Sequence, residues 1–210
     1  MSNHQGEGTY VHPSAHVSET ARIGPGTRIW QQAQVRDRAM VGASCILGKG
    51  VFVDLDVRIG DRCKLENGAQ VFRGITVEDG VFLGPGVMLL NDKRPRAINP
   101  DGSLKSEQDW TISRGVIEYG ASIGGGAVVL PGIRVGRLAM VGSGAVVTKD
   151  VPERGIVYGN PSVLKGFACD CGCSLALVST EGGTVVMRCD SCGRIAHLAP
   201  ATYGQLARPK

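Results

Sequence analysis

The stretch "VGASCILGKGVFVDLDVRIGDRCKLENGAQ", residues 41–70, repeats with a period of six residues. Cut into sixes it reads VGASCI, LGKGVF, VDLDVR, IGDRCK and LENGAQ, so that every unit begins with Val, Ile or Leu. The fifth position of each unit holds Cys, Val or Ala. This period matches neither the 3.6 residues of an amphipathic helix nor the alternation of a hairpin strand. It predicts short, flat strands that are joined by tight turns.

The same phase extends in both directions from this stretch. Fourteen consecutive units cover residues 11–94, and six more cover residues 117–152. All twenty begin with Val, Ile or Leu, and Lys93 is the one fifth-position residue that is not Ala, Thr, Cys, Val or Ile. Glycine is frequent at the second and fourth positions, where it allows backbone angles that a side chain disfavours. We therefore predict an all-β solenoid whose first and fifth positions point inward, Cys45 and Cys63 among them.

Length and composition suit one large domain and a small appendage. We expect the solenoid to occupy residues 1–165 and a cysteine-rich tail to occupy residues 166–210. The N-terminus lacks a basic segment followed by an apolar run, and no stretch approaches the ~20 apolar residues of a membrane span. We therefore expect a cytoplasmic protein with no membrane partner. A net charge of +4 requires no nucleic-acid partner and is equally compatible with a polyanionic small ligand.

The segment "LLNDKRPRAINPDG", residues 89–102, interrupts the repeat. Twenty-two extra residues, 95–116, separate the last unit before the break from the next one. So long a loop within a compact domain is usually either functional or disordered. The polar residues of this loop favour disorder, whereas Trp110, Ile112 and two prolines favour a loop that packs against something. Because insertions in repeat proteins often form the binding face, we expect residues 91–116 to form one wall of a binding site.

Four stretches carry a resemblance to a known family: NDKRPRAINPDGSLK (91–105), GASIGGGAVVLPGIRVG (120–136), AMVGSGAVVTKDVP (139–152) and VYGNPSVLKG (157–166). They resemble the nucleotide-sugar N-acyltransferases of the hexapeptide-repeat family. The resemblance implies a left-handed parallel β-helix with three hexapeptides per coil, and a homotrimer whose active sites lie between neighbouring solenoids. It also implies transfer of an acyl group, usually acetyl from acetyl-CoA, to the amine of a nucleotide-linked deoxysugar. The similarity is greatest to enzymes of dTDP- or UDP-linked 3-amino sugars, such as dTDP-3-amino-3,6-dideoxyhexoses.

The same resemblance suggests roles for residues at the break. Asn91 matches the Asn of the family's loop motif, and the resemblance implies that its side chain meets and orients the sugar amine. Asp92 is interpreted either as an acceptor of the amine's proton or as a turn-forming residue. Arg94 and Arg96 either bind a diphosphate, whose oxygens suit the guanidinium fork, or are solvated loop charges.

Further substrate and coenzyme contacts follow from the same correspondence. Residues on a facing wall and on an earlier coil are expected to bind the substrate: Glu66, Asn67, Arg73 and Gln31. The family stretch that resembles "KLENGAQVFRG", residues 64–74, commonly ends in Tyr-His-Gly, whereas this chain has Arg73 at the position of that His. Backbone amides and lysines of the later coils are expected to meet the pantetheine arm and the phosphates of the coenzyme: Gly124, Gly125, Gly126, Ser143, Gly144, Lys149 and Lys165. Glycine at these positions is also required by the fold alone.

The positions of the histidines bear on the chemistry. His4, His12, His16 and His197 are the four histidines, and none lies near the break or in the later coils. A hexapeptide enzyme that acylates a hydroxyl is expected to need a base, usually His, because an alcohol is a poor nucleophile at neutral pH. An amine with a pKa of about 8 is substantially unprotonated near neutrality and needs only positioning. We therefore predict N-acetyl transfer by orientation, without a histidine base. The alternatives are an O-acyltransferase or another small-amine acyltransferase on this scaffold, or a non-catalytic trimeric scaffold.

Residues 169–193, "CDCGCSLALVSTEGGTVVMRCDSCG", predict a small metal-binding hairpin. Strand-like runs at 174–180 and 184–188 flank a Glu-Gly-Gly turn. Closing this hairpin brings two cysteine pairs together: Cys169 with Cys171, and Cys189 with Cys192. Four thiolates suit a tetrahedral structural zinc ion, and a disulfide is disfavoured in a cytosolic chain. Cys173 is a spare or alternative ligand.

Overall fold

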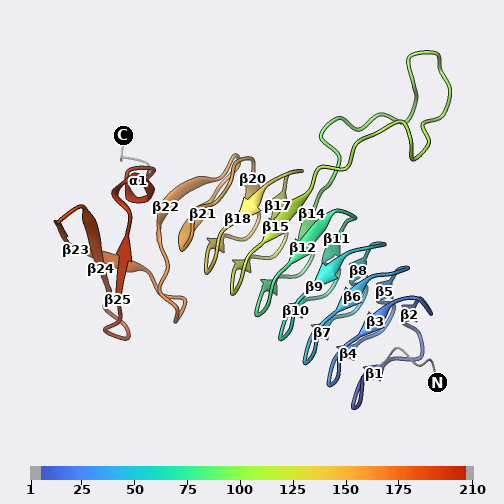
Figure 1. Ribbon diagram of the computed structural model, residues 1–210, viewed down its shortest axis with the longest axis horizontal. Helices are drawn as coiled ribbons and strands as arrows, with labels where there is room; N and C mark the ends of the chain where they lie inside the picture. The colour runs from blue at the N-terminus through green and yellow to red at the C-terminus, as the bar shows by residue number, and fades with distance from the viewer. Residues whose placement is uncertain (1–5, 207–210) are drawn as a thin grey trace.

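The computed structural model describes residues 6–206, and its main body is a left-handed parallel β-helix (Figure 1). Most strands of the helix contain two residues, because each hexapeptide supplies one short strand and one turn. Three sheets run along the solenoid and form its three faces. The chain passes from the first face to the second, then to the third, and then enters the next coil.

The first face consists of β1 (Tyr10–Val11), β4 (Arg28–Ile29), β7 (Ile46–Leu47), β10 (Lys64–Leu65), β13 (Phe82–Leu83), β16 (Ser122–Ile123), β19 (Met140–Val141), β21 (Gly155–Tyr158) and β22 (Val163–Phe167). The second face consists of β2 (His16–Val17), β5 (Gln34–Val35), β8 (Phe52–Val53), β11 (Gln70–Val71), β14 (Met88–Leu89), β17 (Val128–Val129) and β20 (Val146–Val147). The third face consists of β3 (Arg22–Ile23), β6 (Met40–Val41), β9 (Arg58–Ile59), β12 (Ile75–Val77), β15 (Gly115–Ile117) and β18 (Arg134–Val135).

The strand register shows how the break is accommodated. Tyr10 pairs with Arg28, so one coil takes 18 residues, or three hexapeptides. Across the break Met88 pairs with Val128, a separation of 40 residues, which is 22 more than one coil. All the extra residues therefore leave the solenoid between β14 and β15, and the coils stack on either side as if the chain were continuous.

The core is a column of stacked aliphatic side chains. First-position residues such as Ile29, Leu47 and Leu65 have no exposed surface, and the fifth-position Cys45 and Cys63 are buried beside them. Burying one such aliphatic side chain contributes about 1.5–3 kcal/mol, but only when the coils above and below cover it. The inward orientation of the first and fifth positions is thus confirmed.

Each coil has three turns, so the solenoid has three edges. The first edge, between the first and second faces, carries the turns 30–33, 48–51, 66–69, 84–87, 124–127 and 142–145. The second edge, between the second and third faces, carries the turns 36–39, 54–57, 72–74 and 130–133, together with the insertion, residues 90–114. Figure 1 shows the insertion extending away from the solenoid body.

The tail contains more structure than the predicted hairpin. Strands β23 (Leu175–Glu181) and β24 (Thr184–Cys189) form that hairpin, and β25 (Ile195–Leu198) adds a third antiparallel strand. Phe167, at the end of β22, is fully buried and stacks on Tyr203 of the short helix α1 (Pro200–Tyr203), with ring centroids 6.0 Å apart. The buried residues of the tail are therefore continuous with the solenoid core. No helix among residues 6–206 is long and apolar enough to cross a membrane.

Candidate functional site

The base of the insertion is held on the second edge by three hydrogen bonds. The side-chain amide Nδ2 of Asn91 donates to the carbonyl oxygen of Arg73, 3.0 Å away, on the turn of the preceding coil. The backbone N–H of Ser113 donates to the carbonyl of Asn91 over 2.9 Å, and that of Gly115 donates to the carbonyl of Gly74 over 3.3 Å. The outgoing and returning chains are thus tied to each other and to the coil that precedes them.

Side-chain packing adds to these bonds. Ile112 occupies the space that a side chain at Gly74 would need, so this turn accepts only glycine while the insertion is in place. On the other side, the Nζ atom of Lys93 lies 3.0 Å from the position that a Cβ at Gly132 would take. The insertion therefore begins wedged between two turns of the second edge, which supports the packed alternative over the disordered one.

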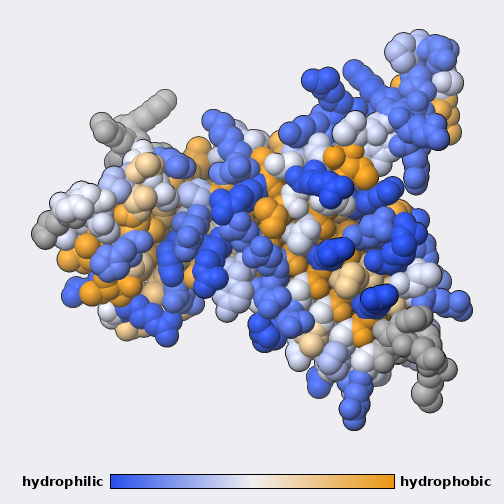
Figure 2. All heavy atoms as spheres, viewed as in Figure 1, coloured by the Kyte–Doolittle hydropathy of each residue, from blue (hydrophilic) through white to orange (hydrophobic). Residues whose placement is uncertain are grey.

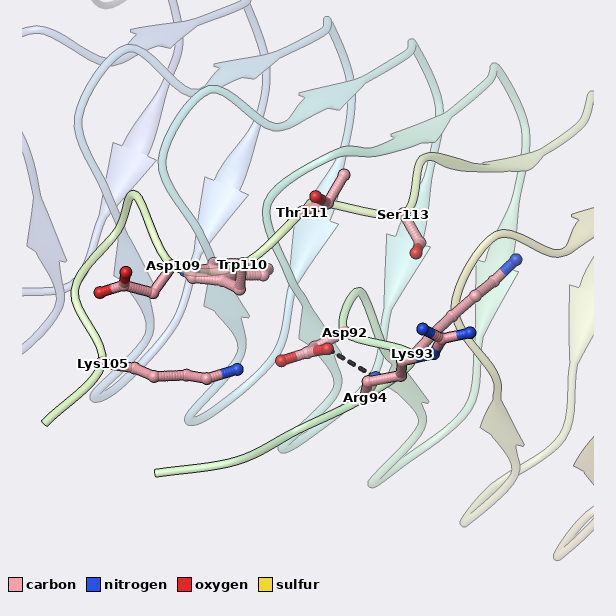
Figure 3. Close-up of a pocket in the computed structure, with 8 residues that line it drawn as sticks. All are labelled: Asp92, Lys93, Arg94, Lys105, Asp109, Trp110, Thr111 and Ser113. Atoms are coloured by element: carbon pink, nitrogen blue, oxygen red, sulfur yellow. Dashed lines mark hydrogen bonds between the residues drawn. The ribbon is translucent and has the colours of Figure 1, made fainter. Parts of the chain in front are cut away.

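Further out, the insertion forms a small hairpin. Ile98 and Leu104 form an isolated antiparallel bridge, and the backbone N–H of Lys105 donates to the carbonyl of Ala97 over 3.0 Å. The backbone N–H of Asn99 donates to the carbonyl of Ser103 over 2.8 Å, and this bond closes the tip of the hairpin. Because this hairpin folds back, Lys105 lies on the returning strand and points toward the base of the insertion (Figure 3).

The insertion and its base border two adjacent cavities that are open to solvent on one side. The first has a volume of about 390 Å³ and is lined by Asp92, Lys93, Arg94, Lys105, Asp109, Trp110, Thr111 and Ser113 (Figure 3). The second, of about 550 Å³, is lined by Asp92, Arg96, Ala97, Leu104, Lys105, Ser106, Glu107 and Trp110. Volumes of this size suit small-molecule ligands. The cavities share Asp92, Lys105 and Trp110, so together they form one ligand-sized space, called here the loop cavity.

The two carboxylates of the first cavity are engaged locally. Asp92 Oδ1 accepts a hydrogen bond from the backbone N–H of Arg94 at 2.8 Å, which is the geometry of a turn-forming aspartate. Asp109 Oδ2 accepts the backbone N–H and the hydroxyl of Ser106, each at 2.7 Å. These two bonds hold the pKa of Asp109 below its usual value.

Arg73 lies beside the insertion, as expected. Its guanidinium forms ion pairs with two carboxylates of the same chain. Its Nη1 is 3.6 Å from Glu107 of the insertion, and its Nε is 3.7 Å from Asp56 on the preceding turn. Asp56 is also bound by the guanidinium of Arg38 at 2.7 Å, and that arginine is the main reason why the pKa of Asp56 is lowered. Arg73 thus connects the insertion to a ladder of charges along the second edge.

Three of the expected substrate residues lie elsewhere. Glu66, Asn67 and Gln31 belong to turns of the first edge, on the far side of the second face from Asn91. Asn67 Oδ1 accepts the backbone N–H of Lys49 at 2.9 Å, which joins two successive turns, and Glu66 pairs with Lys64 at 3.0 Å. A single chain therefore does not bring these three residues to the insertion, and the expected facing wall is not formed within one solenoid.

Most of the expected coenzyme residues share the first edge. Gly124 and Ser143 stack directly, because a side chain at Gly124 would meet the Ser143 backbone, and the N–H of Gly144 donates to Gly125 over 2.9 Å. Lys165 lies near this edge through Tyr158, whose ring centroid is 5.9 Å from its Nζ. Lys149 instead follows β20 on the second edge, beside a separate cavity of about 450 Å³.

A line of glycines at positive φ follows the first edge: Gly50, Gly68, Gly86, Gly126 and Gly144. The same backbone conformation is taken elsewhere in this solenoid by residues with side chains, such as Gln32, Arg38 and Ser44. Positive φ alone therefore does not require glycine at every one of these turns. At all five glycines no heavy atom lies within 4 Å of the position that a Cβ would take. A strip of backbone without side chains therefore runs along the edge, called here the bare glycine strip.

The tail brings four cysteine sulfur atoms together. Those of Cys169, Cys171, Cys189 and Cys192 all lie within 4.8 Å of one another. A hydrogen bond from the backbone of Cys192 lowers the pKa of Cys189 to about 7. The donor set, four thiols from two turns, fits a tetrahedral zinc ion. Cys173 is exposed and contributes its backbone carbonyl, which accepts the N–H of Cys169 at 2.8 Å.

Lys105 is a cavity residue that no feature of the sequence singled out. Its position depends on how an irregular loop folds back, and no periodicity extends into residues 95–114. Two other cavity residues depart from the pattern of the sequence around them. Trp110 is the aromatic residue of a polar loop, and Lys93 is a lysine at the fifth, inward position of a hexapeptide. That both line the same cavity is a property of the folded insertion alone.

Comparison with known proteins adds to this geometry. The family model described as hexapeptide repeat of succinyl-transferase matches residues 37–73, 57–90 and 116–149. The chain is 38% identical over 176 residues to dTDP-3-amino-3,6-dideoxy-alpha-D-galactopyranose 3-N-acetyltransferase from Aneurinibacillus thermoaerophilus, a match that covers 83% of this chain and 86% of that protein. It is 27% identical to galactoside O-acetyltransferase from Lactococcus lactis, over 59% of this chain and 53% of that one.

Among solved structures, the fold is similar to a mutant of GDP-perosamine N-acetyltransferase from Caulobacter crescentus, in complex with CoA and GDP-perosamine. The TM-score is 0.51 at 25% sequence identity, and the match covers 75% of this chain and 56% of that chain. The N-acetyltransferase from Aneurinibacillus is thus more similar in sequence, and over a larger share of its length, than the O-acetyltransferase.

Proposed function

This chain belongs to the hexapeptide-repeat acetyltransferases, and on that basis we propose that it transfers the acetyl group of acetyl-CoA to the amine of a nucleotide-linked amino deoxysugar. The proposed acceptor is a dTDP-3-amino-3,6-dideoxyhexose, because the relative with 38% identity is named for an acceptor of this class. One structural observation carries the proposal. The solenoid opens at Asn91, and the opening leads directly into a cavity lined by Lys93, Arg94 and Lys105.

Asn91 is proposed to orient the nucleophile. Because its Nδ2 donates to the carbonyl of Arg73, its Oδ1 is the side-chain atom that accepts a hydrogen bond from an N–H of the sugar amine. The neutral amine attacks the thioester carbonyl, the new C–N bond forms, and the C–S bond breaks. The thiolate of CoA leaves, and the proton of the resulting ammonium group is lost after the C–N bond has formed, to Asp92 and from there to solvent. The amine's own nucleophilicity and its placement supply the rate.

No histidine of the described chain lies at the break. His12 bonds to Ser14, His16 lies in β2, and His197 lies in β25, while His4 is outside residues 6–206. Asp92 remains the one carboxylate at the mouth of the opening that is proposed to take up the proton. Its turn-forming bond to the Arg94 backbone uses Oδ1, so Oδ2 is the atom that would act.

The active site is proposed to form between neighbouring solenoids of a homotrimer. The expected residues divide between two edges, with Asn91 on the second edge and Glu66, Asn67 and Gln31 on the first. The bare glycine strip also follows the first edge, and its later part, at Gly126 and Gly144, is proposed to receive the pantetheine arm. Packing the first edge of one copy beside the second edge of the next would bring amine and thioester together. Light scattering should then give three times the chain mass of 22.0 kDa.

The four cysteines of the tail are proposed to hold one structural zinc ion. A closed set of four thiolates has no open position for catalysis, so the metal would serve structure and add to the small core that the tail shares with the solenoid. Asp170, between two of the cysteines, pairs with Arg154 of the solenoid at 2.6 Å and with Arg194 at 3.5 Å. The metal site is thereby joined to the last coil.

The function is tested by turnover of acetyl-CoA with a panel of dTDP- and UDP-linked amino sugars and with the matching hydroxyl sugars. The proposal expects acetylation of a 3-amino sugar nucleotide and none of the hydroxyl analogue. Acetylation of a hydroxyl analogue at a comparable rate would favour the O-acyltransferase alternative. Absence of turnover with every acceptor would leave the non-catalytic scaffold.

A further inference from the structure

We propose that the loop cavity is the nucleoside diphosphate subsite of the acceptor, with the nucleobase stacked on Trp110 and the diphosphate bound by Lys93, Arg94 and Lys105. This inference rests on the proposed function, and it names the residues of the insertion that recognise the part of the substrate that does not react. It adds Trp110, Lys93 and Lys105 to the two arginines that the sequence indicated.

The charge of the loop cavity favours a dianionic ligand. Lys93, Arg94, Arg96 and Lys105 line its two parts, and none of these four takes part in an ion pair among residues 6–206. Three carboxylates also line it and keep their charge: Asp92, which accepts a backbone N–H, Asp109, which accepts Ser106, and Glu107, which pairs with Arg73. The four cations therefore exceed the three carboxylates of the lining by one, and a bound diphosphate would supply the ion-pair partners that these cations lack.

Trp110 offers a surface for a flat ring. It is half-buried at the junction of the two parts of the cavity, in a loop whose other residues are mostly exposed. The aromatic and cation–π pairs found in residues 6–206 do not include it. Its ring is therefore not stacked within its own chain. Stacking of one base on an aromatic side chain typically changes affinity by about five- to 150-fold.

The position of the loop cavity also suits an acceptor rather than the coenzyme. Ser113 lines it and is hydrogen-bonded to Asn91, and Asp92, the next residue in the chain, lines both of its parts. A sugar joined to a diphosphate in this cavity would therefore reach the Asn91 side chain. The bare glycine strip lies on a different edge of the same solenoid. The adenosine diphosphate of CoA has similar chemistry, so the experiment must distinguish the two sources.

Intrinsic fluorescence gives a direct test, because the chain has only two tryptophans. Trp30 lies on the first edge, 5.4 Å from the ring of Tyr10, and a Trp30→Phe variant leaves Trp110 as the single tryptophan. Titrating this variant with dTDP, in the absence of any acceptor amine, should quench its fluorescence saturably. Titration with CoA should quench it far less at equal concentration. Stronger quenching by CoA than by dTDP, or no quenching by dTDP, would overturn the assignment.

Calorimetry with dTDP then measures the contribution of each group. Trp110→Ala and Lys105→Ala should each raise the Kd at least about fivefold, and Trp110→Phe should recover part of the loss. Arg58→Ala, which removes an exposed cation of β9 on the third face, is the matched control and should leave the Kd unchanged. Unaltered circular dichroism and melting confirm that the variants fold. A Kd within twofold of wild type for both Trp110→Ala and Lys105→Ala would refute the subsite.

The outcome separates this inference from the proposed function. If dTDP binds through Trp110 but no amino sugar nucleotide is acetylated, the subsite stands and the reaction is wrong. If amino sugar nucleotides are acetylated while Trp110→Ala leaves the acceptor KM unchanged, the reaction stands and the subsite is wrong.

Discussion

The side-chain amide of Asn91 donates a hydrogen bond to the main-chain carbonyl of Arg73, 18 residues earlier and one coil below, over 3.0 Å. This bond does two things at once. It anchors the point where the chain leaves the solenoid, and it decides which atom of the amide is presented to a ligand. With Nδ2 engaged, Oδ1 is left as an acceptor, which is what orienting the N–H of an amine requires.

Replacing Asn91 by Ala should therefore lower kcat/KM by roughly ten- to a thousand-fold, about 1.4–4 kcal/mol, without abolishing turnover. The loss should appear in kcat, because the interaction positions the reacting atom rather than binding the distant nucleotide. Steady-state kinetics with acetyl-CoA and the amino sugar nucleotide measure it. A loss confined to KM, with normal kcat, would show that Asn91 only anchors the insertion.

The rate should rise with pH and level off near the pKa of the acceptor's own amine, because only the neutral amine attacks. A substrate with a different amine pKa should shift the whole profile. Changing His12, His16 or His197 to Gln should alter kcat by less than about threefold. An ascending limb that stays fixed across substrates and is lost in Asp92→Asn would instead identify Asp92 as a general base.

Two deletions in the insertion should behave differently. Removing residues 99–108 deletes Lys105 and Glu107 and opens the loop cavity, so turnover should collapse while oligomeric mass and melting temperature stay nearly unchanged. Removing residues 99–103, replaced by two glycines, shortens only the hairpin tip, which lines neither cavity. This shorter deletion should keep most of the activity. Equal activity of the two variants would contradict the role of the cavity.

A side chain on the later part of the bare glycine strip should interfere with the coenzyme. Gln32 already adopts a φ of 58° on the first edge, so Gly126→Gln should fold at a cost of about 1–2 kcal/mol. Its KM for acetyl-CoA should rise about tenfold or more, because the new side chain would fill the open space above the turn. Gly50→Gln makes the same change on an early coil and is the control. Equal effects of the two substitutions on KM would contradict the assignment to the later coils.

Protein purified without a metal-binding tag and kept reduced should contain about one zinc ion per chain. Cys192→Ser should lose the metal and lower the melting temperature, because the remaining three thiols no longer complete the tetrahedral site that links the two turns of the tail. Cys173→Ser should retain the metal, because the clustered sulfur atoms belong to the other four cysteines of the tail. Metal content below a few tenths of an equivalent in the wild-type chain would reject the site.

The coils could be predicted because their determinants are local and periodic. Every hexapeptide repeats an aliphatic first position and a small fifth position, so one inward column follows from any short stretch such as residues 41–70. The 18-residue register also separates Glu66 and Asn67 from Asn91, since three hexapeptides complete a coil and each turn falls on one edge. The family resemblance grouped these residues into one wall, and the register shows that they belong to different edges of a single chain.

The sequence by itself thus determined the solenoid, the place where it opens, and the cysteines that meet in the tail. Only the tertiary structure decided how residues 95–114 fold back to place Lys105 and Trp110 in one cavity with Lys93, and that β25 and α1 complete the tail. The physical reason is that a repeat places each side chain through its neighbours one coil away, whatever the rest of the chain does. An irregular loop has no such register, and its shape depends on bonds between particular atoms, among them the one from Asn91 to Arg73.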